Sequence, residues 1–218
     1  MFAVIFEEQP KSDRWDQYLN LAGQLRPELE CIDGFIDNER YRSRRTEGRV
    51  LSLSTWADEK AVIRWRTHAM HHGVQEKGRE EVFEDYHLRV GEITDDTDIP
   101  TGHTLTQSRF DMTEVGHAKV VSIVEPLAGT LPDSLHPHGR DGLHDAELFE
   151  GITTPGKLLL LVSWRTPAAA DSWSPPASLP SGARVRHRRV RVIRDYGLAD
   201  RREAPQFYPA AARRVGKG

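Results

Sequence analysis

The chain has 218 residues, of which 38% are hydrophobic and 29% charged, and its formal net charge is -3. This length suits one large or two small domains with hydrophobic cores, and the slightly acidic balance excludes a general affinity for nucleic acid. No apolar stretch is long enough to span a bilayer, and the sequence opens on a strand-like run without a secretory leader, so a cytoplasmic protein without a membrane partner is expected.

Two local features of the composition carry expectations of their own. The single cysteine, Cys31, excludes an intrachain disulfide and is expected to be a small buried residue near a helix end. Arginines crowd residues 184–194, which we interpret as a solvated or interface strand.

The first 95 residues resolve into elements in the order β-α-β-β-α-β. Residues 2–7 alternate as a strand, and Asp13 is placed to cap a helix whose apolar residues recur at helical spacing. Strands follow over residues 35–42 and 50–56. Asp58 is expected to cap a second helix that runs to about Phe83, before a fourth strand over residues 85–93. This order predicts a ferredoxin-like unit, with both helices on one face of an antiparallel sheet.

A second copy of this unit follows the first. Residues 32–65 align without a gap to residues 140–173. The identical pairs include turn glycines and tryptophans: Gly34/Gly142, Gly48/Gly156, Trp56/Trp164, Ala61/Ala169 and Trp65/Trp173. Chance similarity seldom keeps such residues at fixed spacing, so the sequence predicts a tandem duplication.

The second copy is poor in helix. Proline and glycine interrupt residues 126–141, where the first helix should lie, and residues 174–182 end the second helix near Trp173. A sheet without helical cover must bury that face elsewhere, so we expect it to pack against the sheet of the first copy or of a second chain. The expected fold is α+β, with two ferredoxin-like (βαββαβ) repeats, antiparallel sheets and a helix-poor second repeat.

The domain organisation follows from the repeat. We expect a first domain over residues 1–95, a linker over 96–114, a degenerate second repeat over 115–197 and a C-terminal tail over 198–218. Phe207 and Tyr208 in the tail are expected to dock onto a neighbouring surface.

The segment LSLSTWADEKAVIRW and the closing strand EDYHLRV resemble the antibiotic biosynthesis monooxygenase (ABM) family. The resemblance covers residues 1–95 well and residues 115–197 through the repeat. It implies the dimeric α/β barrel fold, formed by a homodimer or by an intrachain pseudo-dimer, with a small-molecule ligand between sheet and helices. The family includes cofactor-free oxygenases and haem-degrading oxygenases, so the resemblance supports the fold more strongly than the chemistry.

The family's site residues match only in part. In the cofactor-free members Trp56 would face an aromatic substrate, but Ser52 stands where they carry Asn and Val62 where they carry Tyr. In the haem-degrading members Trp65 matches the tryptophan that distorts the porphyrin, whereas Gln75 stands at the position of the iron-binding histidine. The position of a supporting asparagine on the first strand is taken by Glu7 or Glu8.

The histidines of the second predicted helix could supply the base or the haem ligand that the incomplete family matches do not identify. His72 is the best candidate for a general base or an axial haem ligand, and His68 and Gln75 lie on the same predicted helix. The expected substrate-binding residues are Trp56, Trp65, Ser52 and Tyr86. No spaced carboxylate completes a metal-binding motif, so no metal site is predicted.

Three functions are compatible with the sequence. The first is a monooxygenase that acts without a cofactor on a planar aromatic or polyketide-type small molecule. Such a substrate is acidic enough to form a carbanion, and the carbanion reacts with O2. The second is a haem-binding or haem-degrading protein of the same fold. The third is a non-catalytic binding or assembly module.

Overall fold

The computed structural model describes residues 1–129, 131–132 and 135–205, so Phe207 and Tyr208 lie outside the described residues. The first copy contains β1 (Phe2–Pro10), η1 (Ser12–Arg14), α1 (Trp15–Glu30), β2 (Phe35–Ser43), β3 (Val50–Trp56), α2 (Glu59–Thr67), α3 (Ala69–Lys77), the π-helical turn η2 (Gly78–Val82) and β4 (Phe83–Asp96). The second copy contains β5 (Val120–Pro126), β6 (Leu143–Gly151), β7 (Leu158–Trp164), α4 (Pro167–Asp171) and β8 (Val185–Gly197). Among all the residues that the structure describes, no helix is long and apolar enough to cross a membrane.

The strands close into one antiparallel barrel in the order β1-β3-β2-β6-β7-β5-β8-β4. Each copy forms the same four-stranded unit, in the order β4-β1-β3-β2 in the first and β8-β5-β7-β6 in the second. The registers correspond too, since Phe2 pairs with Trp56 in the first copy and Val120 pairs with Trp164 in the second. The copies join where β2 meets β6 and where β4 meets β8. The two sheets therefore pack on each other within a single chain, as a barrel formed by an intrachain pseudo-dimer. The expectation that they share the helix-poor face of the second sheet is wrong, because that face lies outside the barrel.

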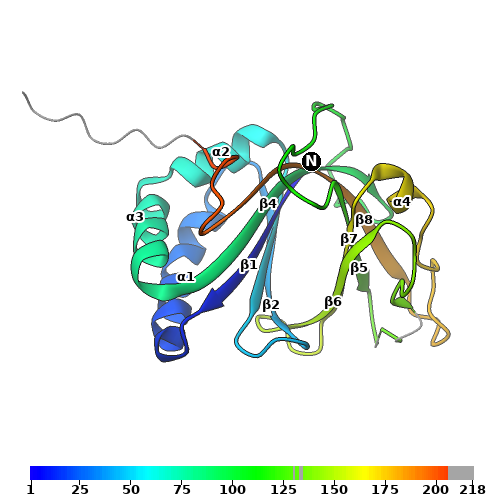
Figure 1. The fold of residues 1–218 in the computed structure, drawn as a ribbon, viewed down its shortest axis with the longest axis horizontal. Helices are drawn as coiled ribbons and strands as arrows, with labels where there is room; N and C mark the ends of the chain where they lie inside the picture. The colour runs from blue at the N-terminus through cyan, green and yellow to red at the C-terminus, as the bar shows by residue number, and fades with distance from the viewer. Residues whose placement is uncertain (130, 133–134, 206–218) are drawn as a thin grey trace, which may run out of the picture.

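Alternation along the strands separates the barrel interior from its outer surface. Inward-facing Ile5 and Leu53 pack with Ile123 and Leu159 of the second copy in one core. The outer face of the first sheet is covered by α1, α2 and α3, whereas α4 is the one short helix that the described residues form near the second sheet (Figure 1). Loop residues cover the second sheet instead, and they include Leu131, Leu135, Trp173 and Leu179.

Two expectations about the helices are wrong in detail. The long second helix breaks at His68, whose extended backbone (φ −62°, ψ 130°) ends α2 and starts α3. The break lets α3 turn against α1, where tertiary contact outweighs helix continuity. Asp13 lies inside η1, and no side-chain hydrogen bond caps α1. The cap at Asp58 is confirmed, since its carboxylate accepts a hydrogen bond from the Ala61 amide at 2.8 Å.

Two expectations about burial are also wrong. Cys31 is exposed, because it follows the last turn of α1 and points away from the sheet-facing residues of that helix. Arg188 is not solvated: its side chain is 2% exposed and pairs with Glu125 inside the barrel. The barrel encloses the face of the strand that carries this arginine.

Candidate functional site

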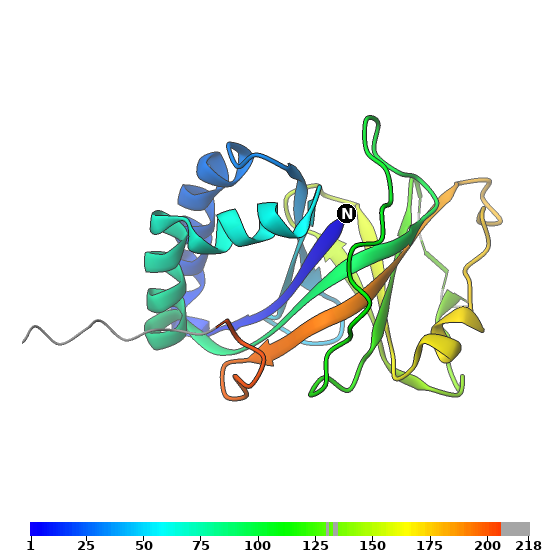
Figure 2. The same cartoon turned by 90° about the horizontal axis from the view of Figure 1, so that it is seen from above.

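A cavity of about 440 Å³ lies between the outer face of the first sheet and its helices. Figure 2 shows α1, α2 and α3 arched over the first sheet, with residues 198–205, which follow β8, near their open side. The apolar floor consists of Val4 and Phe6 on β1 with Leu88 and Val90 on β4. Helix residues such as Leu25 and Trp65 form the cover, and the segment after β8 closes one side through Arg201 and Pro205.

The floor changes from polar to apolar across the sheet. Arg40 lies opposite Ser52, Ser52 lies opposite Phe6, and Phe6 lies opposite Leu88. Asn38, one step along β2 on the same face, donates hydrogen bonds to Ser52 Oγ at 3.2 Å and to the Leu53 carbonyl at 3.1 Å. Along this row a ligand would therefore meet hydrogen-bonding groups over β2 and β3 and hydrocarbon over β1 and β4, with the Glu8 carboxyl group beside Phe6 on β1.

Glu8 is a buried carboxyl group on this floor. It is 4% exposed, and its Oε1 accepts a hydrogen bond from the Tyr18 hydroxyl at 3.4 Å. Burial raises the pKa of Glu8 to about 8, against the opposing effects of the Arg40 charge and the Tyr18 hydrogen bond. The carboxyl group therefore holds a proton near neutral pH and can exchange it with a ligand there.

The cavity carries an excess of positive charge. Glu8 is the one acidic side chain among its described lining residues, which also include Arg26, Arg40, Arg66, Arg79 and Arg201. Arg26 is paired with Glu30 at 2.8 Å, and Arg201 donates a hydrogen bond to the Tyr86 hydroxyl. In the described part of the chain, Nε of Arg40 is buried without a hydrogen-bond partner. This arrangement favours an anionic or strongly polarised ligand.

His71 and Trp65 form a stacked pair in the helical cover. Their ring centroids are 4.1 Å apart with 15° between the planes, and His71 Nδ1 lies 2.8 Å from the Trp65 carbonyl oxygen. Burial lowers the pKa of His71 to about 4, so the ring is neutral at physiological pH. Because a carbonyl can only accept, Nδ1 carries the proton and Nε2 keeps its lone pair, as in a general base or a metal ligand.

The structure brings together five of the seven predicted site residues. Those that line the cavity are Ser52, Trp65, His72, Gln75 and Tyr86. Trp56 and His68 are not among the lining residues. Trp56 is fully buried under α2, where its indole donates to Ser54 Oγ at 2.9 Å. His68 Nε2 lies 3.5 Å from a carboxylate oxygen of Glu28, and His72 Nε2 lies 3.8 Å from one of Glu76.

The lining residues that were not predicted as site residues include Glu8, Tyr18, Asn38, Arg40 and His71. Glu8 left a signal, because it shares a strand face with Val4 and Phe6 and therefore sits at an apolar position. Asn38, on the neighbouring strand, places a side-chain amide next to Ser52, which stands where the cofactor-free members of the family carry Asn. Only the strand register shows that pairing, and a single sequence does not contain it.

Comparison with known proteins agrees with this architecture. The family model described as antibiotic biosynthesis monooxygenase matches residues 1–77. A protein of Pyricularia oryzae named Jasmonate monooxygenase ABM is 44% identical over 226 residues, which cover 97% of this chain and 100% of that protein. The uncharacterized protein YqjZ of Bacillus subtilis is 32% identical over 92 residues, which cover 42% of this chain and 78% of that protein.

A solved structure extends the likeness of fold to both copies. An aldoxime dehydratase in complex with butyraldoxime superposes with a TM-score of 0.55 at 12% identity, covering 91% of this chain and 80% of that chain. At this identity the likeness concerns the fold alone. The sequence relatives, together with the helix-covered sheet and its cavity, establish that the chain is a monooxygenase-like protein of the antibiotic biosynthesis monooxygenase family.

Proposed function

We propose that the protein oxygenates a small ring compound that carries a carbonyl group, bound in the cavity over the first sheet. The observation that carries this proposal is Glu8, a buried carboxyl group whose pKa of about 8 places proton exchange near neutral pH beside an apolar floor. An apolar cavity with a few convergent polar groups and a perturbed carboxyl group is typical of a catalytic site.

Two substrate types fit this description. Planar aromatic polyketides carry a carbonyl on a flat apolar ring. Jasmonate, which the Pyricularia oryzae relative's name specifies, combines a cyclopentanone ring, an apolar chain and a carboxylate. The positive charge around the cavity favours the second type, because a carboxylate would balance it.

The residues on the floor support proton removal next to a carbonyl group. Ser52 Oγ already accepts a hydrogen bond from Asn38, which leaves its hydroxyl hydrogen for a ligand carbonyl oxygen. Donors placed at that oxygen stabilise the enolate that forms when a neighbouring C–H bond loses its proton. Glu8, in its ionised fraction, accepts that proton, and Tyr18 holds the carboxyl group in place. The enolate carbon is then the electron-rich centre that reacts with O2.

The electron balance differs between the two substrate types. When an activated ring methylene becomes a carbonyl, one oxygen atom of O2 is bound to the carbon and the other leaves as water with the two hydrogens of the methylene. The substrate then supplies all the electrons. Hydroxylation of a single C–H bond also forms water, and two further electrons must come from an added reductant. The assay must therefore be run with and without a reductant.

The test is oxygen uptake and ¹⁸O incorporation from ¹⁸O2 with anthrone, a hydroquinone and jasmonic acid. Glu8→Gln should lower the rate by about 100-fold or more, the usual contribution of a positioned acid or base. Glu84→Gln, an exposed change on the same sheet, should leave it unchanged. A folded wild-type protein that incorporates no label from any substrate, with or without reductant, would contradict the proposal and favour a binding module.

A haem-binding function is the second candidate, favoured by the tautomer of His71. With Nδ1 held by the Trp65 carbonyl, Nε2 of His71 is the nitrogen that would hold haem iron, and the iron would supply redox chemistry with O2. This assignment differs from the expected ligand His72. Titration with haemin tests it: a sharp Soret band that is lost in His71→Ala and kept in His72→Ala would support haem binding. A band absent from the wild type would exclude it.

A further inference from the structure

We propose that Arg40 forms a carboxylate-binding subsite, beside the Ser52 hydroxyl that Asn38 orients, and that this subsite fixes the orientation of the ligand in the cavity. The inference rests on the proposed function and deepens it, because it names the chemical group by which the site recognises its substrate.

Arg40 is the guanidinium that rises from the floor of the cavity. Its position on β2 faces the helices, opposite Ser52 on β3. Its Nε is buried without a hydrogen-bond partner in the described structure. Nε itself is closed to solvent, so a ligand carboxylate would bind the terminal N–H groups of this guanidinium, which lines the cavity.

Glu8, the one acidic side chain among the described lining residues, does not balance the charge of Arg40. Glu8 and Tyr18 lie close enough to Arg40 for its charge to lower the pKa of both groups. Burial nevertheless outweighs this effect at Glu8, which therefore stays protonated near neutral pH and leaves the charge of Arg40 unbalanced. A ligand carboxylate would balance the charge and also accept from the planar fork of the guanidinium.

The strand register sets the direction in which the ligand would lie. From Arg40 the floor passes through Ser52 to Phe6 and then to Leu88, so polarity falls across the sheet. A carboxylate at Arg40 therefore places the apolar body of the ligand over β1 and β4. In that position the body also passes Glu8, which neighbours Phe6 on the same face of β1.

Binding of acid and ester pairs tests the subsite on the full chain. The probes are 1-naphthaleneacetic acid and jasmonic acid, each compared with its methyl ester, with dissociation constants from calorimetry. We expect the wild type to bind each acid about tenfold or more tighter than its ester, the gain typical of a charge-assisted hydrogen bond. Arg40→Gln should weaken binding of the acids to the level of the esters and leave the esters unchanged.

Arg42→Gln is the matched control. Arg42 lies two residues along the same strand face but outside the cavity, where it pairs with Glu150 at 3.1 Å and is 63% exposed. This variant should keep the full preference for the acids. Arg40→Lys keeps the charge and loses the planar fork, so it should keep part of the preference for the acids. This variant replaces Arg40→Gln in the test if Arg40→Gln does not fold. Equal binding of acid and ester by the wild type, or no binding of either acid, would overturn the subsite.

Oxygen uptake on the same samples separates this inference from the proposed function. Acid-selective binding that depends on Arg40, without any oxygenated product, would support the subsite and contradict the monooxygenase activity. Product formation without preference for the acids would support the monooxygenase activity and contradict the subsite.

Discussion

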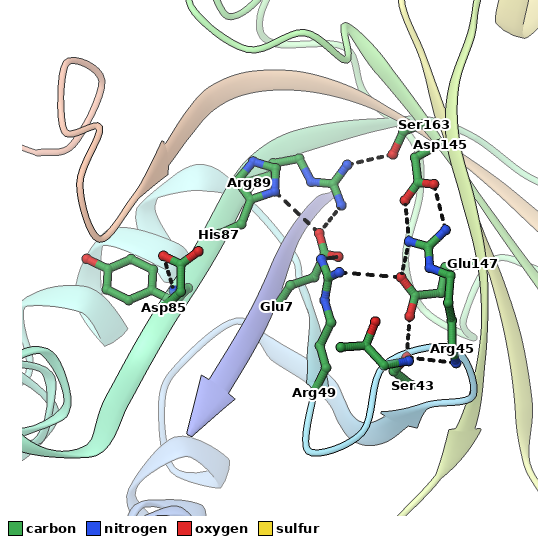
Figure 3. A network of polar contacts seen from close by, with 12 residues as sticks. Glu7, Ser43, Arg45, Arg49, Asp85, His87, Arg89, Asp145, Glu147 and Ser163 are labelled. Atoms are coloured by element: carbon green, nitrogen blue, oxygen red, sulfur yellow. Dashed lines mark hydrogen bonds and ion pairs between the residues drawn. The ribbon is translucent and has the colours of Figure 1, made fainter. Parts of the chain in front are cut away.

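Arg89 on β4 donates a hydrogen bond at 2.8 Å to Ser163 on β7, across the barrel from one copy of the repeat to the other. The same arginine pairs with Glu7 (Figure 3). The strand registers make Arg188 the counterpart of Arg89, and Arg188 donates at 3.1 Å to Thr55 in the first copy. Each copy therefore places an arginine on the third strand of the other, and the two polar clusters join the halves of the barrel.

Loss of this contact should destabilise the whole barrel. Burial raises the pKa of Glu7, but Arg89, His87 and Arg49 outweigh it and lower the pKa to about 2. Arg89→Met would leave that carboxylate with weaker partners and should lower the free energy of unfolding by about 3 kcal/mol. Urea denaturation measures the change, with Arg42→Met, an exposed arginine, as a control that should cost less than about 1 kcal/mol.

The pH dependence of the Arg89→Met effect provides a second check. Because the folded pKa of Glu7 lies below its usual 4.5, its ion pair contributes stability above pH 4.5 that is lost as the pH falls toward 2. The difference between wild type and Arg89→Met should therefore shrink in acid. A difference that stays constant down to pH 2.5 would rule out Glu7 as its origin.

Glu8 should have the opposite pH signature. Its folded pKa of about 8 lies above its usual 4.5, so the folded state binds more protons than the unfolded state between these values. Stability from this group is complete below pH 4.5 and is lost as the pH rises through 8. Glu8→Gln, which stays neutral, should become increasingly stable relative to wild type between pH 5 and pH 9, measured by urea denaturation. Glu84→Gln should show no such trend, since Glu84 is exposed.

The repeated glycines explain why the duplication is visible in the sequence. Gly34 has φ +86°, and a Cβ there would lie 2.7 Å from Cβ of Ala61. Gly142 has φ +73°, and its Cβ would lie 2.4 Å from Cβ of Ala169. The same turn thus meets the same helix start in both copies, which requires a glycine and a small residue at these two positions.

Substitution of either glycine should therefore be costly. Gly34→Ala and Gly142→Ala should each destabilise the protein by about 2 kcal/mol or more, from the left-handed backbone and the close contact together. Adding Ala61→Gly to Gly34→Ala relieves the contact but not the backbone strain, so it should recover only part of the loss. Thermal denaturation of the single and double variants measures both parts, and a Gly34→Ala protein as stable as wild type would contradict the geometry.

The sequence predicts the strands well because alternation and turn residues are local. It leaves open how the barrel closes, since the β2–β6 and β4–β8 contacts join segments that no local pattern links. Arg188 shows the same limit: alternation assigns it to a strand face, but only closure shows that this face is interior. Strand alternation places Glu8 at an apolar position, but the shifted pKa values of Glu8 and His71 depend on how deeply the sheet and the helices bury them, which no local pattern gives.

The tryptophans that mark the repeat now have different surroundings, and this difference predicts one ligand site per chain. Trp65 lines the cavity, whereas its counterpart Trp173 is 7% exposed and packs with Trp164 at 5.6 Å among the loop residues that cover the second sheet. Calorimetry with 1-naphthaleneacetic acid should give one ligand per chain. Trp65→Ala should weaken that binding strongly. Trp173→Ala should leave it unchanged while lowering stability by about 3–5 kcal/mol, the usual cost of truncating a buried tryptophan. Two ligands per chain, or a loss of binding in a folded Trp173→Ala protein, would mean that the second sheet also holds a site.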